Sequence, residues 1–198
     1  MNFKKVIVGF TLSLLLGSAM ARAADLYTGI SAFVSGDYKT ALAELTPIAE
    51  QGDASAQLYL GSMYDDGDGV PENDKTAVKW YTKAAEQGNA GAQWVLGGMY
   101  DRGLGVLEND KTAVKWYSLA AIQGNASAQY YLGYMYANGT GLLTDYPRAY
   151  MWWNLAAYNG EKIASDNKGK LATEMTPADI SKAQEMSIRC MESNYTEC

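Results

Sequence analysis

The apolar positions of residues 54–88 predict two helices joined by a polar loop. Small and apolar side chains recur at three- and four-residue steps from Ala56 to Tyr64, and again from Ala77 to Ala85. This is the period of one helix face. Glycines and a proline in the segment DDGDGVPENDKT separate the two runs. The alternation of small and aromatic positions favours helices that cross closely, with alanine or glycine of one helix receiving a ring of the other.

This pattern repeats at a fixed offset of 36 residues. Residues 53–88 and 89–124 are identical at 25 of 36 positions, and residues 125–160 continue the pattern more loosely. Upstream, GDYKTALAELTPIAEQG (36–52) matches the second half of a unit. After Gly160 the pattern fades, although the segment TPADISKAQEMSIRCMES still begins with the threonine and proline of a helix N-terminus.

A single helix hairpin of this length cannot bury a core alone, so neighbouring units must stack. The predicted fold is all-α, a right-handed α-solenoid of stacked antiparallel helix hairpins. The last segment is expected to shield the open end of the stack with capping helices. The predicted organisation is a signal peptide, a first hairpin, three repeats and a capping segment, with the boundaries 1–23, 24–52, 53–88, 89–124, 125–160 and 161–198.

The repeat resembles the Sel-1-like repeat family, which is related to the tetratricopeptide repeats. The family pattern A-x-A-Q-x-x-L-G-x-x-Y, then G-x-G-V, then W-Y-x-x-A-A-x-x-G, stands almost intact in residues 54–88 and 90–124. The third copy departs in its loop, with Leu142 in place of valine and with Pro147 and Arg148 in place of Lys-Thr. The resemblance implies a stacked helical fold and a role as an interaction scaffold, and far less about any activity.

The first 23 residues have the pattern of a secretory signal peptide. Lys4 and Lys5 precede an apolar run, and Ala21 and Ala23 supply small residues at the −3 and −1 positions. The apolar run is short for a transmembrane span. We therefore expect cleavage before Ala24 and an exported protein, periplasmic or secreted, without integral membrane association.

Charge and composition narrow the classes of partner and activity. The chain has a net charge of −6, and cleavage of the signal would leave 13 basic residues against 22 acidic ones. Nucleic acid is therefore a poor candidate partner. The sequence contains no histidine, which excludes His-based catalytic triads and His-ligated zinc. No cofactor and no metal are expected.

The two cysteines, Cys190 and Cys198, lie close together at the C-terminus. Export to an oxidising compartment favours a disulfide over free thiols. A continuous helix would hold the two Cα atoms about 12 Å apart, whereas a disulfide needs less than about 7 Å. We therefore expect the helix to stop just after Cys190 and the tail to fold back through a turn at Ser193 and Asn194.

The acidic loop after Tyr64 has three possible interpretations: a cation site, a phosphate loop or a turn. If a calcium loop began at Asp66, Val70 would stand at an oxygen-ligand position and Ala77 at the position of the required glutamate. A phosphate loop would need a third glycine or a Gly-Lys pair, which the segment lacks. The other copies lose the acidic pair and keep the glycines, which favours a turn in which Gly67 ends the first helix.

A second candidate site is SDNK at 165–168, which contains both the S-x-x-K and S-D-N elements of penicillin-interacting serine enzymes. In those enzymes the two elements are separate segments, so sharing Ser165 does not build the site. Cysteine-rich relatives of the repeat family are linked to β-lactam binding, but this chain lacks their cysteine pair in each repeat. A β-lactam-interacting hydrolase that uses Ser165 and Lys168 is therefore the least favoured hypothesis.

A third candidate is a strip of apolar and aromatic side chains that do not repeat, beside aspartates. In stacked helix hairpins the first helices line the concave surface, and the exposed positions of these helices differ between the copies. They predict a partner-binding groove formed by Leu58, Ser62, Asp65, Asp66, Trp94, Asp101, Tyr130 and Tyr134. An apolar strip beside carboxylates suits a peptide or helix that carries positive charge. The alternative is that the rings only pack against adjacent helices.

These observations predict an exported, non-catalytic scaffold that binds another protein or a peptide through its concave face. A second hypothesis is a module that binds cell-wall glycan or another polysaccharide, because aromatic rings beside aspartates also hold sugars. The sequence does not name the partner, because the exposed positions of repeat scaffolds do not spell a ligand.

Overall fold

The computed structural model describes residues 25–198, and the predicted signal peptide lies outside these residues. The described part of the chain is helical and has no β-strand. A first helix covers residues 25–35. It is followed by α2 to α10, with the bounds α2 Tyr38–Glu50, α3 Ala54–Asp66, α4 Asp74–Glu86, α5 Ala90–Arg102, α6 Asp110–Ala121, α7 Ala126–Asn138, α8 Tyr146–Tyr158, α9 Lys162–Ala172 and α10 Pro177–Glu192.

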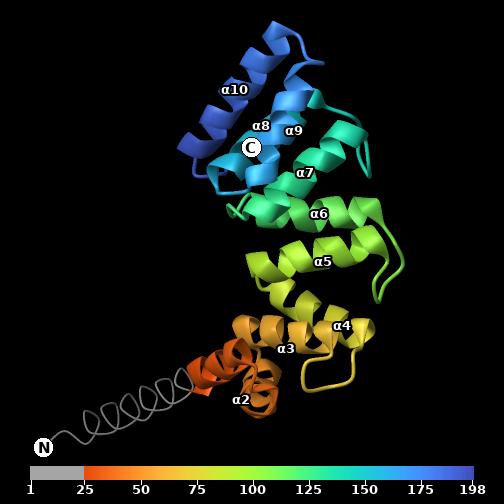
Figure 1. The fold of residues 1–198 in the computed structure, drawn as a ribbon, viewed down its shortest axis with the longest axis vertical. Helices are drawn as coiled ribbons and strands as arrows, with labels where there is room; N and C mark the ends of the chain where they lie inside the picture. The colour runs from red at the N-terminus through yellow and green to blue at the C-terminus, as the bar shows by residue number, and fades with distance from the viewer. Residues whose placement is uncertain (1–24) are drawn as a thin grey trace, which may run out of the picture.

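The helices form antiparallel hairpins that stack along the long axis of the molecule (Figure 1). The hairpins α3–α4, α5–α6 and α7–α8 correspond to the three copies of the repeat, and each packs on the next through its second helix. The loops inside these hairpins lie along one edge of the stack (Figure 1). The prediction of an all-α repeat solenoid is confirmed.

Each repeat begins and ends through side chains that recur in the sequence. Asp53, Asn89 and Asn125 cap the N-termini of α3, α5 and α7, each accepting a hydrogen bond from a backbone N–H of the first turn. At the other end of α5, Gly103 adopts a left-handed conformation (φ 68°) and its N–H donates to Met99 O. Such a φ favours glycine, so this position stops the helix.

The second glycine of the loop has a separate function, which is to permit contact with the preceding repeat. At Gly105 (φ 66°), an added Cβ would lie 2.5 Å from the backbone carbonyl carbon of Asp74, the first residue of α4. Gly141 meets Asp110 in the same way at 2.7 Å. The G-x-G pattern therefore combines a helix stop with a close approach between the loop of one repeat and the second helix of the repeat before it.

Inside each hairpin, a glycine of the first helix receives an aromatic ring of the second. A Cβ added to Gly61, Gly97 or Gly133 would lie 2.7 Å from a ring atom, of Tyr81, Tyr117 and Trp153 respectively. Tyr117 is almost completely buried, as are the alanines and leucines around it. The predicted exchange of small and aromatic positions is thus the contact that holds the two helices together.

The glutamine of the A-x-A-Q segment joins neighbouring repeats. Gln93 is buried, and its Nε2 donates to the carbonyl of Ala85 in the last turn of α4 at 3.0 Å. Its Oε1 accepts from Nε2 of Gln123, which follows α6, at 2.7 Å. Gln57 and Gln129 donate in the same way to Ala49 and Ala121. Each glutamine gives a helix-end carbonyl at the seam a second donor, in addition to the backbone N–H of Gly52, Gly88 or Gly124.

The C-terminal helices close the stack in a way that differs from a further repeat. Both α9 and α10 pack on α8, and few contacts join α9 to α10 directly. In Figure 1, α10 runs beside α8 at the end of the stack opposite α2. Thr176 caps α10 through Asp179 N–H, and Pro177 occupies its first turn, as predicted. The Trp152 ring, from α8, is buried in a cluster that includes Cys190.

Candidate functional site

The face formed by the first helices α3, α5 and α7, here called the first-helix face, carries a cavity of about 340 Å³. Three successive hairpins contribute to it, so it exists only because the repeats stack. We call it the Trp94 cavity, and its lining residues are Ser62, Asp65, Tyr81, Trp94, Val95, Gly98, Asp101, Arg102, Tyr117 and Tyr131.

Aromatic rings supply much of the surface of the Trp94 cavity. The rings of Tyr117 and Tyr131 are stacked, with centroids 5.4 Å apart and planes inclined by 9°. Tyr131 is 39% exposed, whereas Tyr117 is buried. Trp94 is half-buried and packs against the cluster formed by α6, α7, α8 and Cys190 of α10. The cavity therefore presents flat apolar faces that solvent can reach, the kind of surface that is enriched in protein interfaces.

Two carboxylates, Asp65 and Asp101, line the cavity at equivalent positions of successive repeats. Burial raises the pKa of Asp65, and the neighbouring charges of Asp66 and Asp74 raise it further. Burial likewise raises the pKa of Asp101, with a contribution from Asp110. Within residues 25–198 neither carboxylate has an ion-pair partner, since the ion pair found there joins Arg148 and Asp145. Both groups thus lose hydration without gaining a bound cation.

Arg102 is the basic residue of the cavity lining. Its side chain folds back along α5, and its Nε donates to the carbonyl oxygen of Gly98 at 3.2 Å. Its charge partly offsets the upward shift in the pKa of Asp65 and of Asp101. The guanidinium therefore acts on both carboxylates from a distance, without forming an ion pair with either.

The buried phenols of the cavity, Tyr81 and Tyr117, remain neutral hydrogen-bonding groups. Burial raises the pKa of Tyr81 well above its usual range, with the nearby charge of Asp65 adding to the shift. Burial also raises the pKa of Tyr117. The hydroxyl of Tyr81 donates to Oδ2 of Asp65 at 3.4 Å. A neutral phenol in this position steadies the carboxylate without neutralising it.

Four of the eight residues predicted for the groove meet in this cavity: Ser62, Asp65, Trp94 and Asp101. Two others lie outside its lining. Asp66 is exposed and accepts a hydrogen bond from Ser62 Oγ at 3.2 Å. Leu58 packs toward the start of α5, where its Cδ2 would lie 3.3 Å from a Cβ added to Gly91.

Tyr130 and Tyr134 lie one repeat further along the first-helix face. The hydroxyl of Tyr130 accepts a hydrogen bond from Asn167 of α9 at 3.2 Å, and its carbonyl accepts from Trp153 Nε1 at 3.0 Å. Tyr134 is 48% exposed and lines a second hollow of about 290 Å³, together with Ala137, Asn138, Tyr146, Trp153, Asn167, Lys170, Leu171 and Glu174. Tyr130 thus joins the third repeat to the cap, while Tyr134 extends the accessible surface.

Sequence reasoning missed Tyr81, Tyr117, Tyr131 and Arg102 as parts of the site. Tyr81 and Tyr117 occupy a repeated position of the second helix, whose period indicates the core, and they do lie there, but both residues also line the cavity. Arg102 could have been found from the sequence, because its position differs between the copies. Asp66 and Asn138 occupy the equivalent positions. The criterion that selected the aromatic strip would also have selected Arg102.

The acidic loop at 65–76 and the SDNK segment at 165–168 were the other two candidate sites. Residues 65–76 form the end of α3, a glycine turn and the start of α4. Within the described residues, no three His, Cys, Asp or Glu side chains are grouped as a metal site would require. Ser165 is exposed on α9, and Lys168 Nζ donates to Asn154 Oδ1 at 2.8 Å. The lysine ammonium is therefore held by an amide of α8.

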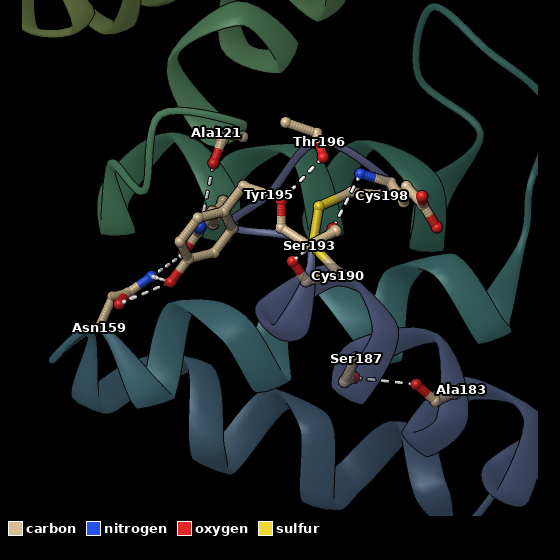
Figure 2. The surroundings of a disulfide bond; sticks show 11 residues. Ala121, Asn159, Ala183, Ser187, Cys190, Ser193, Tyr195, Thr196 and Cys198 are labelled. Atoms are coloured by element: carbon tan, nitrogen blue, oxygen red, sulfur yellow. Dashed lines mark hydrogen bonds between the residues drawn. A yellow bond between two sulfur atoms is a disulfide. The ribbon is translucent and has the colours of Figure 1, made fainter.

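Cys190 and Cys198 form a disulfide, with their Cα atoms 4.7 Å apart. The helix α10 ends at Glu192, two residues after Cys190, and the chain turns through Asn194 and Tyr195, which both have positive φ. Figure 2 shows Tyr195 pointing from this turn toward Asn159 at the end of α8. The early helix stop and the folded tail are as predicted from the spacing of the cysteines.

A family model described as Sel1 repeat matches residues 54–89, 90–125 and 126–161. The matches cover more than half of the 198 residues, and the chain belongs to the Sel1 repeat family. Repeats of this kind commonly mediate protein–protein interaction, and scaffolds of the family are generally non-catalytic. No curated protein showed significant similarity to the chain.

Among solved structures, the fold is similar to the Sel1 repeat protein from Oxalobacter formigenes, with TM-score 0.70, 39% identity, and coverage of 73% of this chain and 59% of that one. It is also similar to c5321, a protective antigen of uropathogenic Escherichia coli displaying an SLR fold, with TM-score 0.79, 29% identity, and coverage of 88% and 39%. The chain thus spans 59% and 39% of the lengths of these two proteins.

A third similar structure is the Helicobacter pylori cysteine rich protein B (hcpB). The TM-score is 0.53 at 22% identity, with coverage of 66% of this chain and 93% of that chain. At this identity the similarity concerns the fold alone. Separately, none of the helices in residues 25–198 combines the length and the apolar character that crossing a membrane requires.

Proposed function

We propose that this protein is an exported, non-catalytic scaffold that binds a segment of another protein on its first-helix face, with the Trp94 cavity at the centre of the contact. The observation that carries the proposal is the meeting of accessible aromatic rings with two carboxylates that lack a cation partner among the described residues. Tryptophan and tyrosine dominate the energetics of protein interfaces.

The chemistry of the cavity supports binding more than catalysis. Its lining offers two carboxylates, one guanidinium, a serine hydroxyl and tyrosine phenols. Neither histidine nor thiol is among these groups, and burial keeps the Tyr81 and Tyr117 phenols protonated. Such a set can accept hydrogen bonds from a cation and stack on flat groups, and it does not contain histidine, the side chain that most often transfers protons near neutral pH.

Export is supported by two independent features. The N-terminal residues have the order expected of a signal peptide, with cleavage before Ala24. At the other end of the chain, Cys190 and Cys198 form a disulfide. Disulfides form and persist mainly in oxidising compartments outside the cytoplasm. Cell fractionation with N-terminal sequencing tests this part of the proposal. A mature chain that keeps Met1 and remains in the cytoplasm would contradict it.

Site-specific photo-crosslinking in the source organism tests the binding surface. A benzoylphenylalanine placed at Tyr131, which is 39% exposed in the cavity, is expected to form a light-dependent adduct with a protein. Tyr158, which is 74% exposed on α8, is the control position. The adduct at position 131 should disappear when Trp94→Ala is added, whereas the circular dichroism spectrum should not change.

The outcomes of this experiment separate the functional classes. The same products at positions 131 and 158 would overturn the assignment of the surface. An adduct that contains cell-wall glycan in place of protein would establish the alternative ligand class, because sugars also stack on aromatic rings beside carboxylates.

A further inference from the structure

We propose that the Trp94 cavity takes one arginine side chain of the bound segment between Asp65 and Asp101, and that Arg102 is the internal cation which this side chain displaces. The inference rests on the proposed function, and it names the chemical group that the site selects and the residue that sets its selectivity.

The two carboxylates supply the first part of the argument. Asp65 and Asp101 line the same cavity and are about half-buried, yet neither has an ion-pair partner within residues 25–198. The phenol of Tyr81 donates to Asp65, which fixes the direction of that carboxylate. Partly desolvated anions that are held in place but lack a counter-ion are complementary to an incoming cation.

The aromatic rings decide which cation fits. A guanidinium is planar, is weakly hydrated and stacks on aromatic faces while its edge donates to carboxylates. The cavity offers the stacked Tyr117–Tyr131 pair and Trp94 next to both aspartates. Its volume of about 340 Å³ is on the order of ten water molecules, so a side chain can enter it without remodelling of the helices.

Arg102 shows that the same cavity already accommodates a guanidinium. Its side chain lies over Gly98, and a Cβ added to Gly98 would come within 3.3 Å of Arg102 Nη2. The equivalent positions in the other copies are Ser62 and Tyr134. Glycine is thus found in the copy in which an arginine folds back along the helix, and its lack of a side chain makes the room.

Arg102 is held weakly in this position. Its side chain makes one hydrogen bond in the described structure, from Nε to Gly98 O, and the residue is exposed. A guanidinium has five N–H donors, so most of its hydrogen-bonding capacity faces solvent. Moving Arg102 outward exchanges one part-buried hydrogen bond for hydrogen bonds to water, while an incoming arginine gains both carboxylates. Arg102 therefore competes with the ligand without closing the cavity.

Titration with a small probe tests the inference directly. N-acetyl-arginine amide is added to the full-length ¹⁵N-labelled protein, and the indole N–H signal of Trp94, assigned with Trp94→Phe, is followed by NMR. We expect saturable shifts of this signal. N-acetyl-citrulline amide has the same shape without the charge, and it should bind about tenfold more weakly or less, because charge-assisted hydrogen bonds are lost.

Three variants should change the affinity for the arginine probe in different ways. Asp101→Asn should weaken binding of the arginine probe about tenfold. Arg102→Gln should tighten it about threefold, because a competing cation is removed. Glu86→Gln removes an exposed carboxylate of α4 that is outside the cavity lining, and it should leave the dissociation constant unchanged within about twofold. Thermal unfolding of each variant confirms that it is folded.

Specific results would overturn the inference. Equal binding of the citrulline and arginine probes would show that the charge is not recognised, and weaker binding by Arg102→Gln would show that Arg102 assists the ligand. If the Trp94 signal does not respond while the protein adduct at position 131 persists, the inference fails and the proposed function stands. If the Trp94 signal does not respond and the protein adduct at position 131 is also absent, both the inference and the proposed function are overturned.

Discussion

The side-chain amide of Asn159 donates a hydrogen bond to Oε1 of Gln129 at 2.9 Å. In the two preceding repeats this donor is a glutamine, Gln87 or Gln123. The shorter asparagine also lies within hydrogen-bonding distance of the Tyr195 hydroxyl, 2.9 Å from its Nδ2 and 3.1 Å from its Oδ1. The folded tail therefore takes part in the last seam between repeats, where Tyr195 lies against Asn159 and Gly124.

The buried glutamines are expected to stabilise the seams between repeats. Gln93→Ala removes the hydrogen bonds to Ala85 O and from Gln123 Nε2. Gly88 N–H still donates to Ala85 O, and Gln123 Nε2 still donates to Leu119 O, so the cost is that of two lost hydrogen bonds, about 1–3 kcal/mol in total. We expect a fall of that size in the free energy of unfolding, measured by urea denaturation. Gln123→Ala is the control, because Gln123 is exposed, and it should cost less. Equal losses would contradict the role given to the buried amide.

The contact between Gly97 and Tyr117 predicts a second effect. An added Cβ at Gly97 would lie 2.7 Å from Cδ1 of a ring that is itself buried. Gly97→Ala should therefore destabilise the protein by about 1–3 kcal/mol, the usual cost of overpacking. Gly169 lies inside α9 with no atom within 4 Å of its added Cβ, so Gly169→Ala should stabilise by about 0.5–1 kcal/mol. Thermal unfolding of the two variants should move in opposite directions.

The carboxylate of Asp101 is expected to reduce stability at neutral pH. Its pKa in the folded protein is raised, mainly by burial and then by Asp110, so folding favours the protonated form. That stabilisation is fully present below the ordinary pKa of an aspartate and is lost as the pH rises through the raised value. Asp101→Asn should therefore be more stable than the parent at pH 7, by less than about 1 kcal/mol because the group is partly solvated.

The pH dependence of this difference is its test. Denaturation at pH 7 and at pH 3 should show the advantage of Asp101→Asn at pH 7 and nearly none at pH 3, where both side chains are neutral. A variant that is less stable than the parent at pH 7 would show that the charge has a stabilising partner. Together with the arginine titration, the expected result would show a carboxylate that lowers stability and supports binding.

Loss of the disulfide should release the C-terminal tail without unfolding the repeats. Cys198→Ser opens a loop of eight-residue separation, and the chain-entropy relation gives a cost of about 2–3 kcal/mol. Hydrogen exchange should accelerate in the last turns of α10 and at the α6–α7 turn, where Tyr195 packs against Gly124. Amides of α3 and α4 serve as the internal control. Faster exchange throughout the stack would contradict a local role for the tail.

The fold could be predicted from the sequence because one structural unit occurs in three consecutive copies. A period of 36 residues with two helical faces and fixed glycines leaves few ways to bury the apolar positions. The capping segment was less predictable, since its sequence does not repeat. The helix α10 packs on α8 through side chains such as Trp152. The sequence pattern of the capping segment alone does not predict which helix it will pack against.

The candidate site was only partly predictable for the same reason. Trp94 and Asp101 were found because they occupy exposed positions on first helices, and the Trp94 position differs between the copies. Tyr117 belongs to a core position by its period, yet its buried ring extends beyond Gly97 so that its hydroxyl lies 3.4 Å from the added Cβ of Gly98. A helical period assigns whole residues to a face, whereas a long side chain can fill the core and line a cavity at once.

The glutamine contacts have a consequence for how the chain acquires its shape. Gln93 joins a carbonyl eight positions earlier to an amide thirty positions later, so every seam closes within a short stretch of chain. Such low contact order permits fast folding that can begin in any hairpin and spread in both directions. Because each seam needs only the unit before it, inserting a copy of residues 89–124 should lengthen the stack by one unit without redesign of the others.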